Sequence, residues 1–275
     1  MISQIKQIAS QLETVYPADE AKALAWWIAE ETTGLSRSQI LTGCKITKNF
    51  AHTQEIVERL LHFEPIQYIF GHTEWAGLDL IVTPSTLIPR PETAELVEKI
   101  SNCKWQISNC RVLDIGTGSG CIAIALKKRY PNWQVTGIDI SAEAIEVARE
   151  NARRNHVEVD FHVVDILGVQ NTGVQNDFDV IVSNPPYIRD SEKSAMRPNV
   201  LNYEPATALY VSDEDPLLFY RRIAQLQLGK HLFFEINEAF GKEIADMLQR
   251  ECYTDIHIHQ DSYGKDRFIS SRVAG

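Results

Sequence analysis

The pattern of apolar and polar positions divides the chain into a helical first part and a longer second part in which strands and helices alternate. In the first part apolar residues recur at helical spacing, as at Ile5, Ile8 and Leu12, which predicts helices over residues 1–62. We expect Asp19 to cap the second helix and Ser36 the third. The pattern fits a small helical domain. This domain either only packs on the main domain or recognises a partner.

The character of the sequence changes between residues 63 and 84. Glu64-Pro65 ends the helical pattern, and the stretches 68–72 and 75–82 are rich in aromatic and β-branched residues with glycines between them. We therefore predict a β-hairpin that links two domains.

A stiff segment follows the hairpin. Leu87–Thr93 places prolines on both sides of Arg90, and Glu92 or Thr93 is expected to open a helix that runs to Ile100. The Arg90 guanidinium is expected either to form a surface ion pair or to lie as a charged group at the rim of an active site.

From Arg111 onward, short apolar runs rich in β-branched residues alternate with amphipathic helical segments. This alternation is typical of a doubly wound α/β domain, which we place at residues 85–275. The predicted strands are 111–115, 134–138, 159–164, 178–182, 231–236, 254–259 and 267–270.

Polar clusters follow the first four predicted strands: Gly116–Gly120, Asp139, Asp165 and Ser183–Tyr187. The carboxyl ends of parallel strands share one edge of a sheet, where open α/β sheets bind ligands. The glycines let a ligand approach the backbone closely, and an acidic residue roughly twenty positions later is placed to hold a ribose. Asp139 suits a dinucleotide or S-adenosylmethionine, but Cys121 stands where the dinucleotide fingerprint has its third glycine.

The stretch Asn184-Pro185-Pro186-Tyr187 carries the candidate chemistry. Two prolines cannot continue a strand ladder, so the chain must leave the sheet in a rigid turn. The Asn184 oxygen and the Pro185 carbonyl can each accept one N–H of a planar NH₂ group, and the Tyr187 ring can pack on its plane. The alternative is a plain strand-ending turn in which Tyr187 only borders the core.

Composition narrows the function classes. Among 275 residues 44% are hydrophobic and 23% charged, as in an ordinary globular protein, and the formal net charge is −10 with a pI of about 5.3. This acidic balance argues against general nucleic-acid binding. We expect no membrane span, no signal peptide and no metal site, and we interpret the five cysteines as reduced thiols of a cytoplasmic protein.

These residues resemble the class I S-adenosylmethionine-dependent methyltransferases, and more closely the PrmC/HemK-type family of release factor glutamine methyltransferases. The resemblance covers nearly the whole chain, and its most specific part is Leu87–Thr93. The other matching segments are 65–71, 114–120, 183–187 and 203–209. This chain departs from the family pattern at 210–217 and at 235–240.

The resemblance implies a mostly parallel seven-stranded sheet, a helical N-terminal substrate-recognition domain and a hairpin linker. It also implies methylation of the side-chain amide nitrogen (N5) of the glutamine in the Gly-Gly-Gln motif of peptide chain release factors. The implied partners are release factors, without direct nucleic-acid or membrane binding. The implied S-adenosylmethionine site consists of Asp114, Gly116, Thr117, Gly118, Ser119, Gly120, Asp139, Asp165, Ile166 and Asn184. The implied catalytic and substrate-binding residues are Asn184, Pro185, Pro186 and Tyr187, with Arg90 on the substrate side.

Two other interpretations remain open at this point. A methyltransferase acting on the exocyclic amino group of adenine or guanine would carry the same turn, because that group is also a planar NH₂. A non-catalytic S-adenosylmethionine-binding module would be favoured by a degraded Asn-Pro-Pro-Tyr stretch, whereas this one is intact.

Overall fold

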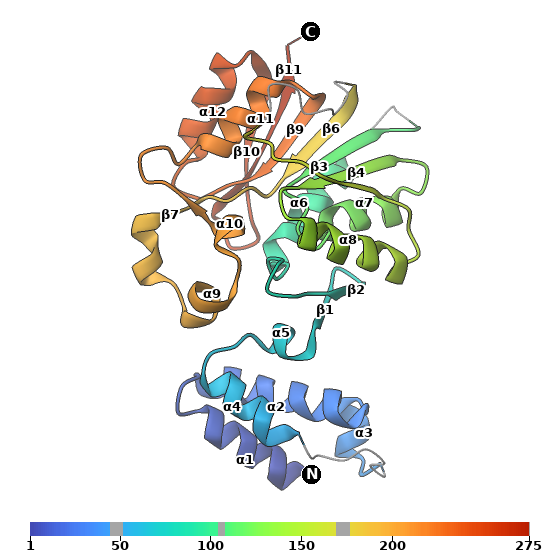
Figure 1. The fold of residues 1–275 in the computed structure, drawn as a ribbon, viewed down its shortest axis with the longest axis vertical. Helices are drawn as coiled ribbons and strands as arrows, with labels where there is room; N and C mark the ends of the chain where they lie inside the picture. The colour runs from blue at the N-terminus through green and yellow to red at the C-terminus, as the bar shows by residue number, and fades with distance from the viewer. Residues whose placement is uncertain (45–51, 104–107, 169–176, 275) are drawn as a thin grey trace. The chain divides into compact units, whose positions relative to one another are not determined.

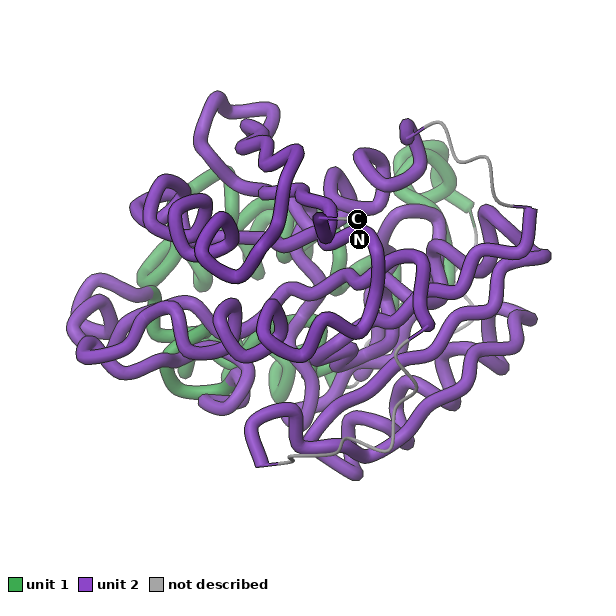
Figure 2. The backbone as a smooth tube through the Cα atoms, turned by 90° about the horizontal axis from the view of Figure 1, so that it is seen from above, with its two compact units in different colours: residues 1–70, 197–203 green, residues 71–196, 204–275 purple. Residues whose placement is uncertain are grey.

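The computed structural model describes residues 1–44, 52–103, 108–168 and 177–274. It contains two compact units, one made of residues 1–70 and 197–203 and the other of residues 71–196 and 204–275 (Figure 2). The domain boundaries expected at residues 62 and 84 stay predictions. Residues 45–51 of the expected helical domain lie outside the described part of the chain.

The first unit consists of helices around an apolar core that includes Leu12, Ile28 and Leu60. Tyr203, from the distant segment 197–203, donates a hydrogen bond from its hydroxyl to the carbonyl of His62 at 2.9 Å. The helices of this unit are α1 (Ile2–Leu12), α2 (Ala18–Thr33), α3 (Arg37–Leu41), α4 (Thr53–Leu61), α5 (Ile66–Phe70) and α9 (Pro198–Tyr203). The expected helical N-terminal region is therefore confirmed.

Two local expectations in this unit were wrong and one is confirmed. Asp19 does not cap α2; the helix begins at Ala18 after Pro17, so Asp19 lies in the first turn, where a negative charge favours the helix dipole. Residues 66–70 are a helical turn rather than a strand, because the amides of Tyr68 and Ile69 both donate to the Pro65 carbonyl. Ser36 caps α3 in a capping box with Gln39.

The predicted hairpin is confirmed over residues 72–81, within the second unit. Strands β1 (His72–Trp75) and β2 (Leu78–Ile81) pair antiparallel around Ala76-Gly77, where both residues have positive φ. Trp75 and Leu80 are buried in the core of this unit.

The second unit is built on a seven-stranded sheet with the order β10-β11-β9-β6-β3-β4-β5 (Figure 1). The five strands from β9 to β5 are parallel, and β10 and β11 are antiparallel additions at one side. The strands are β3 (Arg111–Ile115), β4 (Gln134–Asp139), β5 (Asp160–Val163), β6 (Phe178–Ser183), β9 (Gly229–Glu235), β10 (Tyr253–Gln260) and β11 (Asp266–Val273). The doubly wound, mostly parallel sheet predicted from the sequence is confirmed.

Helices cover both faces of this sheet, because successive strand residues point to opposite sides. Val112 packs in the core shared with α6 (Pro91–Asn102), α7 (Cys121–Arg129) and α8 (Ala142–Arg154). Its neighbour Leu113 packs in the core shared with α11 (Leu218–Leu226) and α12 (Gly241–Arg250). A small second sheet pairs β7 (Ile188–Arg189) with β8 (Tyr210–Val211), and short helices η1 (Asp190–Ala195) and α10 (Ala206–Leu209) lie between them in sequence.

The chain order places a topological switch between β3 and β6. From β3 the chain continues outward to β4 and β5, and it then returns to build β6 and β9 on the other side. Open parallel sheets bind ligands at such a point, outside the carboxyl ends of the strands.

Candidate active site

A cavity of about 360 Å³ lies within the second unit at the carboxyl ends of the parallel strands. Its size falls in the range of small-molecule sites. Of the residues predicted from the sequence, the cavity lining contains Arg90, Gly116, Thr117, Gly118, Ser119, Asp139, Asp165, Ile166, Asn184, Pro185 and Pro186. Asp114, Gly120 and Tyr187 are not in this lining.

The glycine turn after β3 forms one wall of the cavity. Gly116 and Gly118 have φ of 72° and 54°, a region that favours glycine, and an added Cβ at either position would meet no atom within 4 Å. The open side of the turn is therefore backbone that a ligand can approach.

Asp139, the last residue of β4, is tied to this turn. Its two carboxylate oxygens accept hydrogen bonds from the amide of Gly118 at 2.9 Å and from the amide of Ser141 at 3.0 Å. A carboxylate has about four lone-pair sites, so each oxygen can still accept a hydrogen bond from a ligand hydroxyl. The carboxylate is thus oriented by backbone and keeps capacity for a diol.

Asp114 lies buried beneath the turn, inside β3. One oxygen accepts hydrogen bonds from the Thr117 hydroxyl at 2.6 Å and the Ala123 amide at 3.3 Å, while the other is buried with no partner among the described residues. Burial raises the pKa of Asp114 to about 7, against these two hydrogen bonds. That second oxygen is therefore a buried polar atom that the described residues leave unsatisfied.

Asp165 and Ile166 come shortly after β5 and line the cavity. Asp165 accepts a hydrogen bond from the amide of Leu167 at 2.9 Å, which fixes its carboxylate at the strand end. Apolar side chains of Ile138, Ile140 and Ile166 share the lining. One carboxylate among apolar side chains suits a flat heterocycle with a polar edge.

The corner after β6 forms the other wall. Ser183 ends the strand and donates its hydroxyl to the Ile115 carbonyl at 2.6 Å, which ties the end of β6 to the end of β3. Asn184 and the two prolines then leave the sheet and line the cavity. The corner is rigid because both prolines have restricted φ and neither has an amide hydrogen to bond elsewhere.

Beside this corner lies a connected set of polar groups from three elements, in which Thr93 and Glu235 are buried and Thr93 also belongs to the cavity lining. The Asn184 amide nitrogen donates to the Thr93 hydroxyl oxygen at 3.2 Å, and the Thr93 hydroxyl donates to Glu235 at 2.7 Å. The Tyr187 hydroxyl donates to the other oxygen of Glu235 at 3.2 Å. Because Ser183 on β6 is level with Phe234 on β9, the residues that follow them, Asn184 and Glu235, are held at one sheet edge.

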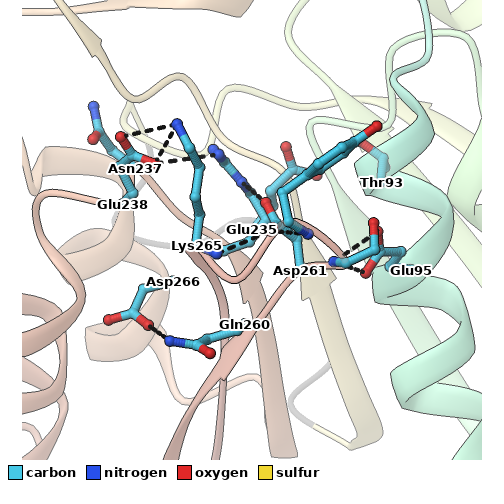
Figure 3. A network of polar contacts seen from close by, with 12 residues as sticks. Thr93, Glu95, Glu235, Asn237, Glu238, Gln260, Asp261, Lys265 and Asp266 are labelled. Carbon is cyan, nitrogen blue, oxygen red and sulfur yellow. Dashed lines mark hydrogen bonds and ion pairs between the residues drawn. The ribbon is translucent and has the colours of Figure 1, made fainter.

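Burial and the neighbouring polar groups have opposite effects on the pKa of Glu235. Burial raises the pKa of the Glu235 carboxyl above its ordinary value, although the hydrogen bonds from Thr93 and Tyr187 and the charge of Arg267 act to lower it. Burial, with the Glu235 charge adding to it, raises the pKa of Tyr187, which stays a neutral phenol that donates. Figure 3 shows the wider polar network at this end of β9, with Thr93 and Glu95 on α6 and Asp261 and Lys265 on the β10–β11 turn.

Arg90 makes an ion pair and also lines the cavity. Its guanidinium contacts the buried carboxylate of Glu204 at 2.6 Å, and the other oxygen of Glu204 accepts from the Ile88 amide at 3.2 Å. The Trp75 indole donates to the Arg90 carbonyl at 2.7 Å. These contacts hold the segment before α6 in place, and Pro91, not Glu92 or Thr93, is the first residue of that helix.

Sequence reasoning missed Thr93 and Glu235 as site residues. Glu235 had a signal, since it is a carboxylate at the end of an apolar strand, as Asp139 is. Thr93 had none beyond its place in the proline-arginine segment, because its contacts are with residues more than 90 positions away.

Two kinds of feature are absent from the described ranges. Within residues 1–44, 52–103, 108–168 and 177–274, no group of three or more His, Cys, Asp or Glu side chains is placed to hold a metal ion. Across the same ranges no helix is both long and apolar enough to span a bilayer.

Comparison with known proteins gives two family matches and several relatives of similar length. The family described as "PrmC N-terminal domain" matches residues 4–71, and the family described as "Methyltransferase domain" matches residues 106–238. A "Release factor glutamine methyltransferase" of Bacteroides thetaiotaomicron is 43% identical, with 96% of this chain and 97% of the relative covered. Proteins of the same name from Flavobacterium psychrophilum and Lactococcus lactis are 40% and 37% identical, each over at least 95% of both chains.

Solved structures resemble the fold at low sequence identity. The "hMettl16 catalytic domain" has a TM-score of 0.56 at 16% identity, covering 72% of this chain and 77% of that one. A "Methyltransferase from Pyrococcus furiosus" has a TM-score of 0.51 at 21% identity, covering 80% and 98%. These likenesses concern the fold alone.

Proposed function

The chain belongs to the family of release factor glutamine methyltransferases, and we propose that it transfers a methyl group from S-adenosylmethionine to the N5 side-chain amide of the glutamine in the Gly-Gly-Gln motif of peptide chain release factors. The observation that carries this proposal is the corner Asn184-Pro185-Pro186 lining the same cavity as the glycine turn and Asp139. Groups that can accept hydrogen bonds from a planar NH₂ and groups that can bind a nucleoside thus line the same cavity. The family match favours a protein acceptor over nucleic acid and over a module without chemistry.

The residues present fit S-adenosylmethionine. Asp139 keeps lone pairs that would accept from the two ribose hydroxyls, and Asp165 with Ile166 would border the adenine. Asp114, whose second oxygen has no partner among the described residues, would favour the methionine ammonium by its charge from beneath the glycine turn. When bound, S-adenosylmethionine supplies a methyl group on a positively charged sulfur, so the new N–C bond forms as the C–S bond breaks.

The corner orients a weak nucleophile. The nitrogen lone pair of a carboxamide is delocalised into its carbonyl, so positioning has to supply much of the rate. Asn184 Oδ1 and the Pro185 carbonyl would each accept one N–H of the glutamine amide, which fixes the nitrogen and favours positive charge building on it. Packing of the Tyr187 ring on that amide stays a prediction. No base is required in this scheme, because the proton can leave to water after transfer.

Arg90 is proposed as part of the substrate side of the cavity. Its guanidinium is held by Glu204 and lines the space beside the corner. From there it can donate to a carbonyl of the release factor backbone. The helical N-terminal domain is proposed to recognise the release factor, in a protein that acts in the cytoplasm.

Mass spectrometry of a release factor incubated with the protein and S-adenosylmethionine tests the function. The expected result is a gain of one methyl group, mapped to the glutamine of Gly-Gly-Gln. Two controls are matched to it: the Asn184→Ala enzyme, and a release factor in which that glutamine is replaced by asparagine. Methylation of another residue, or none by the wild-type enzyme, would refute the proposal.

A further inference from the structure

We infer that Thr93 and Glu235 are positioning residues that set the orientation of the Asn184 amide, so that its oxygen and not its nitrogen faces the substrate. This inference rests on the proposed function and goes beyond it by adding two residues that never need to touch the substrate. The evidence is the Glu235–Thr93–Asn184 chain of hydrogen bonds, which joins β9, α6 and the corner after β6.

These hydrogen bonds distinguish the two ends of an amide side chain, which are nearly symmetric in shape. The oxygen and the NH₂ of asparagine have nearly the same shape, and only the oxygen can accept an N–H from a glutamine amide. A flipped Asn184 would present two donors to a donor and would repel the substrate nitrogen. The fold therefore needs a contact that distinguishes one end of this side chain from the other.

Glu235 supplies the direction. An ionised carboxylate only accepts hydrogen bonds, and its two oxygens receive the hydroxyls of Thr93 and Tyr187 at 2.7 and 3.2 Å. Arg267, on the neighbouring strand β11, provides a positive charge that favours the ionised form. The single hydroxyl hydrogen of Thr93 is thereby committed to Glu235.

Thr93 in turn determines which end of the Asn184 amide it contacts. With its hydrogen engaged, its oxygen can only accept, so the group of Asn184 that approaches it at 3.2 Å has to be the NH₂. The Asn184 oxygen is then the end of the amide left to face the cavity, whose lining includes Asn184. Thr93 and Glu235 are both buried, at 3% and 1% exposure, so solvent competes little for these bonds.

The test compares Thr93→Val, which keeps the shape but removes the hydroxyl, with Thr93→Ser, which keeps it. Thr93→Val is expected to lower kcat about 10- to 100-fold, the scale for misplacing a group that acts on the reacting atoms. Cofactor affinity is expected to stay within about threefold, since Thr93 has no hydrogen bond to the glycine turn or Asp139. Thr93→Ser should recover most of the turnover.

A matched control and a double variant separate positioning from general damage. Thr73→Val changes a similarly buried threonine in the hairpin strand β1, away from the cavity lining, and is expected to keep kcat. Adding Thr93→Val to Asn184→Ala should cause no further loss of activity, because the side-chain amide that Thr93 orients is already absent. Equal losses in Thr93→Val and Thr93→Ser, or full additivity with Asn184→Ala, would overturn the inference.

Nuclear magnetic resonance of the Asn184 side-chain NH₂ gives a reading that does not need the substrate. Its signals, identified by their loss in Asn184→Ala, are expected to exchange slowly with water in the wild type and at least about tenfold faster in Thr93→Val, through loss of one buried bond. If the wild type failed to methylate release factors, the proposed function would fall while this experiment still decided the orientation. Unchanged exchange in Thr93→Val would overturn the positioning role even with an active enzyme.

Discussion

The ends of β4 and β5 and the corner after β6 differ in how their polar groups are satisfied. On the first side, backbone amides orient the carboxylates, two for Asp139 and one for Asp165, and lone pairs stay open for a ligand. On the second side, Asn184, Thr93, Glu235 and Tyr187 are bonded to one another beside the corner. The first arrangement is suited to binding a ligand, and the second to holding one amide in one orientation.

This difference leads to an expected separation of effects. Changes at Asp139 should act on cofactor affinity, and changes at the corner should act on turnover. Turnover and cofactor affinity are both measured for Asn184→Ala and Asp139→Ala, and a variant that changes the other quantity instead would contradict this separation.

The largest effect is expected for Asn184→Ala. Loss of the oxygen that accepts the substrate N–H should lower kcat by about 100- to 1,000-fold, as loss of a preorganised hydrogen-bonding group does in other sites. Cofactor affinity, measured by isothermal titration calorimetry, should change little. Asn132→Ala, on an exposed turn before β4, is the control. Equal losses of turnover and affinity would show that Asn184 only supports the structure.

The next effect is expected for Asp139→Ala. Losing the charge-assisted bonds to the ribose should weaken cofactor binding by about 1–3 kcal/mol, with kcat at saturating cofactor much less affected. Asp160→Ala, which removes a carboxylate at the amino end of β5, should leave the affinity unchanged. A normal affinity in Asp139→Ala would refute the ribose role.

A smaller effect concerns pH. The pKa of Asp114 is raised to about 7, so below that pH the carboxyl of the free protein is protonated and cannot pair with an ammonium group. Binding of the cofactor favours the ionised form, so affinity should rise roughly five- to tenfold as pH increases from about 6 to about 7.5. Asp114→Asn should flatten this rise in calorimetric titrations. An equal rise in the variant would assign the dependence to another group.

The smallest effect is expected for Tyr187→Phe. The variant removes the donor to one oxygen of Glu235 but leaves Thr93 on the other, so the corner keeps its orientation. We expect a loss of about 0.5–1.5 kcal/mol in the free energy of unfolding and only a few-fold loss in kcat. Denaturant titration and steady-state kinetics measure the two. A loss as large as that of Asn184→Ala would mean that the Tyr187 hydroxyl itself meets the substrate.

Local sequence signals predicted much of the fold and the polar residues at the carboxyl ends of the parallel strands. The strands of the sheet are short β-branched runs, and the polar residues at their carboxyl ends, such as Asp139 and Asn184, meet at one edge because the strands are parallel. The doubly wound order then brought the glycine turn and the corner together at the switch between β3 and β6.

The parts that sequence reasoning missed depend on long-range contacts or on one backbone choice. Thr93 bonds Glu235 across 142 positions, and Arg90 pairs with Glu204 across 114, so neither contact leaves a periodic trace. Residues 66–70 carry β-type side chains but fold as α5, because the Pro65 carbonyl accepts the amides that would otherwise join a strand. Tertiary packing overrode propensity there.

The most direct test of the account is a crystal structure of the protein with S-adenosylhomocysteine and a glutamine-containing peptide from a release factor. The account predicts the glutamine amide nitrogen at about 2.9 Å from both Asn184 Oδ1 and the Pro185 carbonyl, with Asn184 Nδ2 still on Thr93. A glutamine amide bound elsewhere, or an Asn184 side chain turned with its nitrogen toward the substrate, would contradict it.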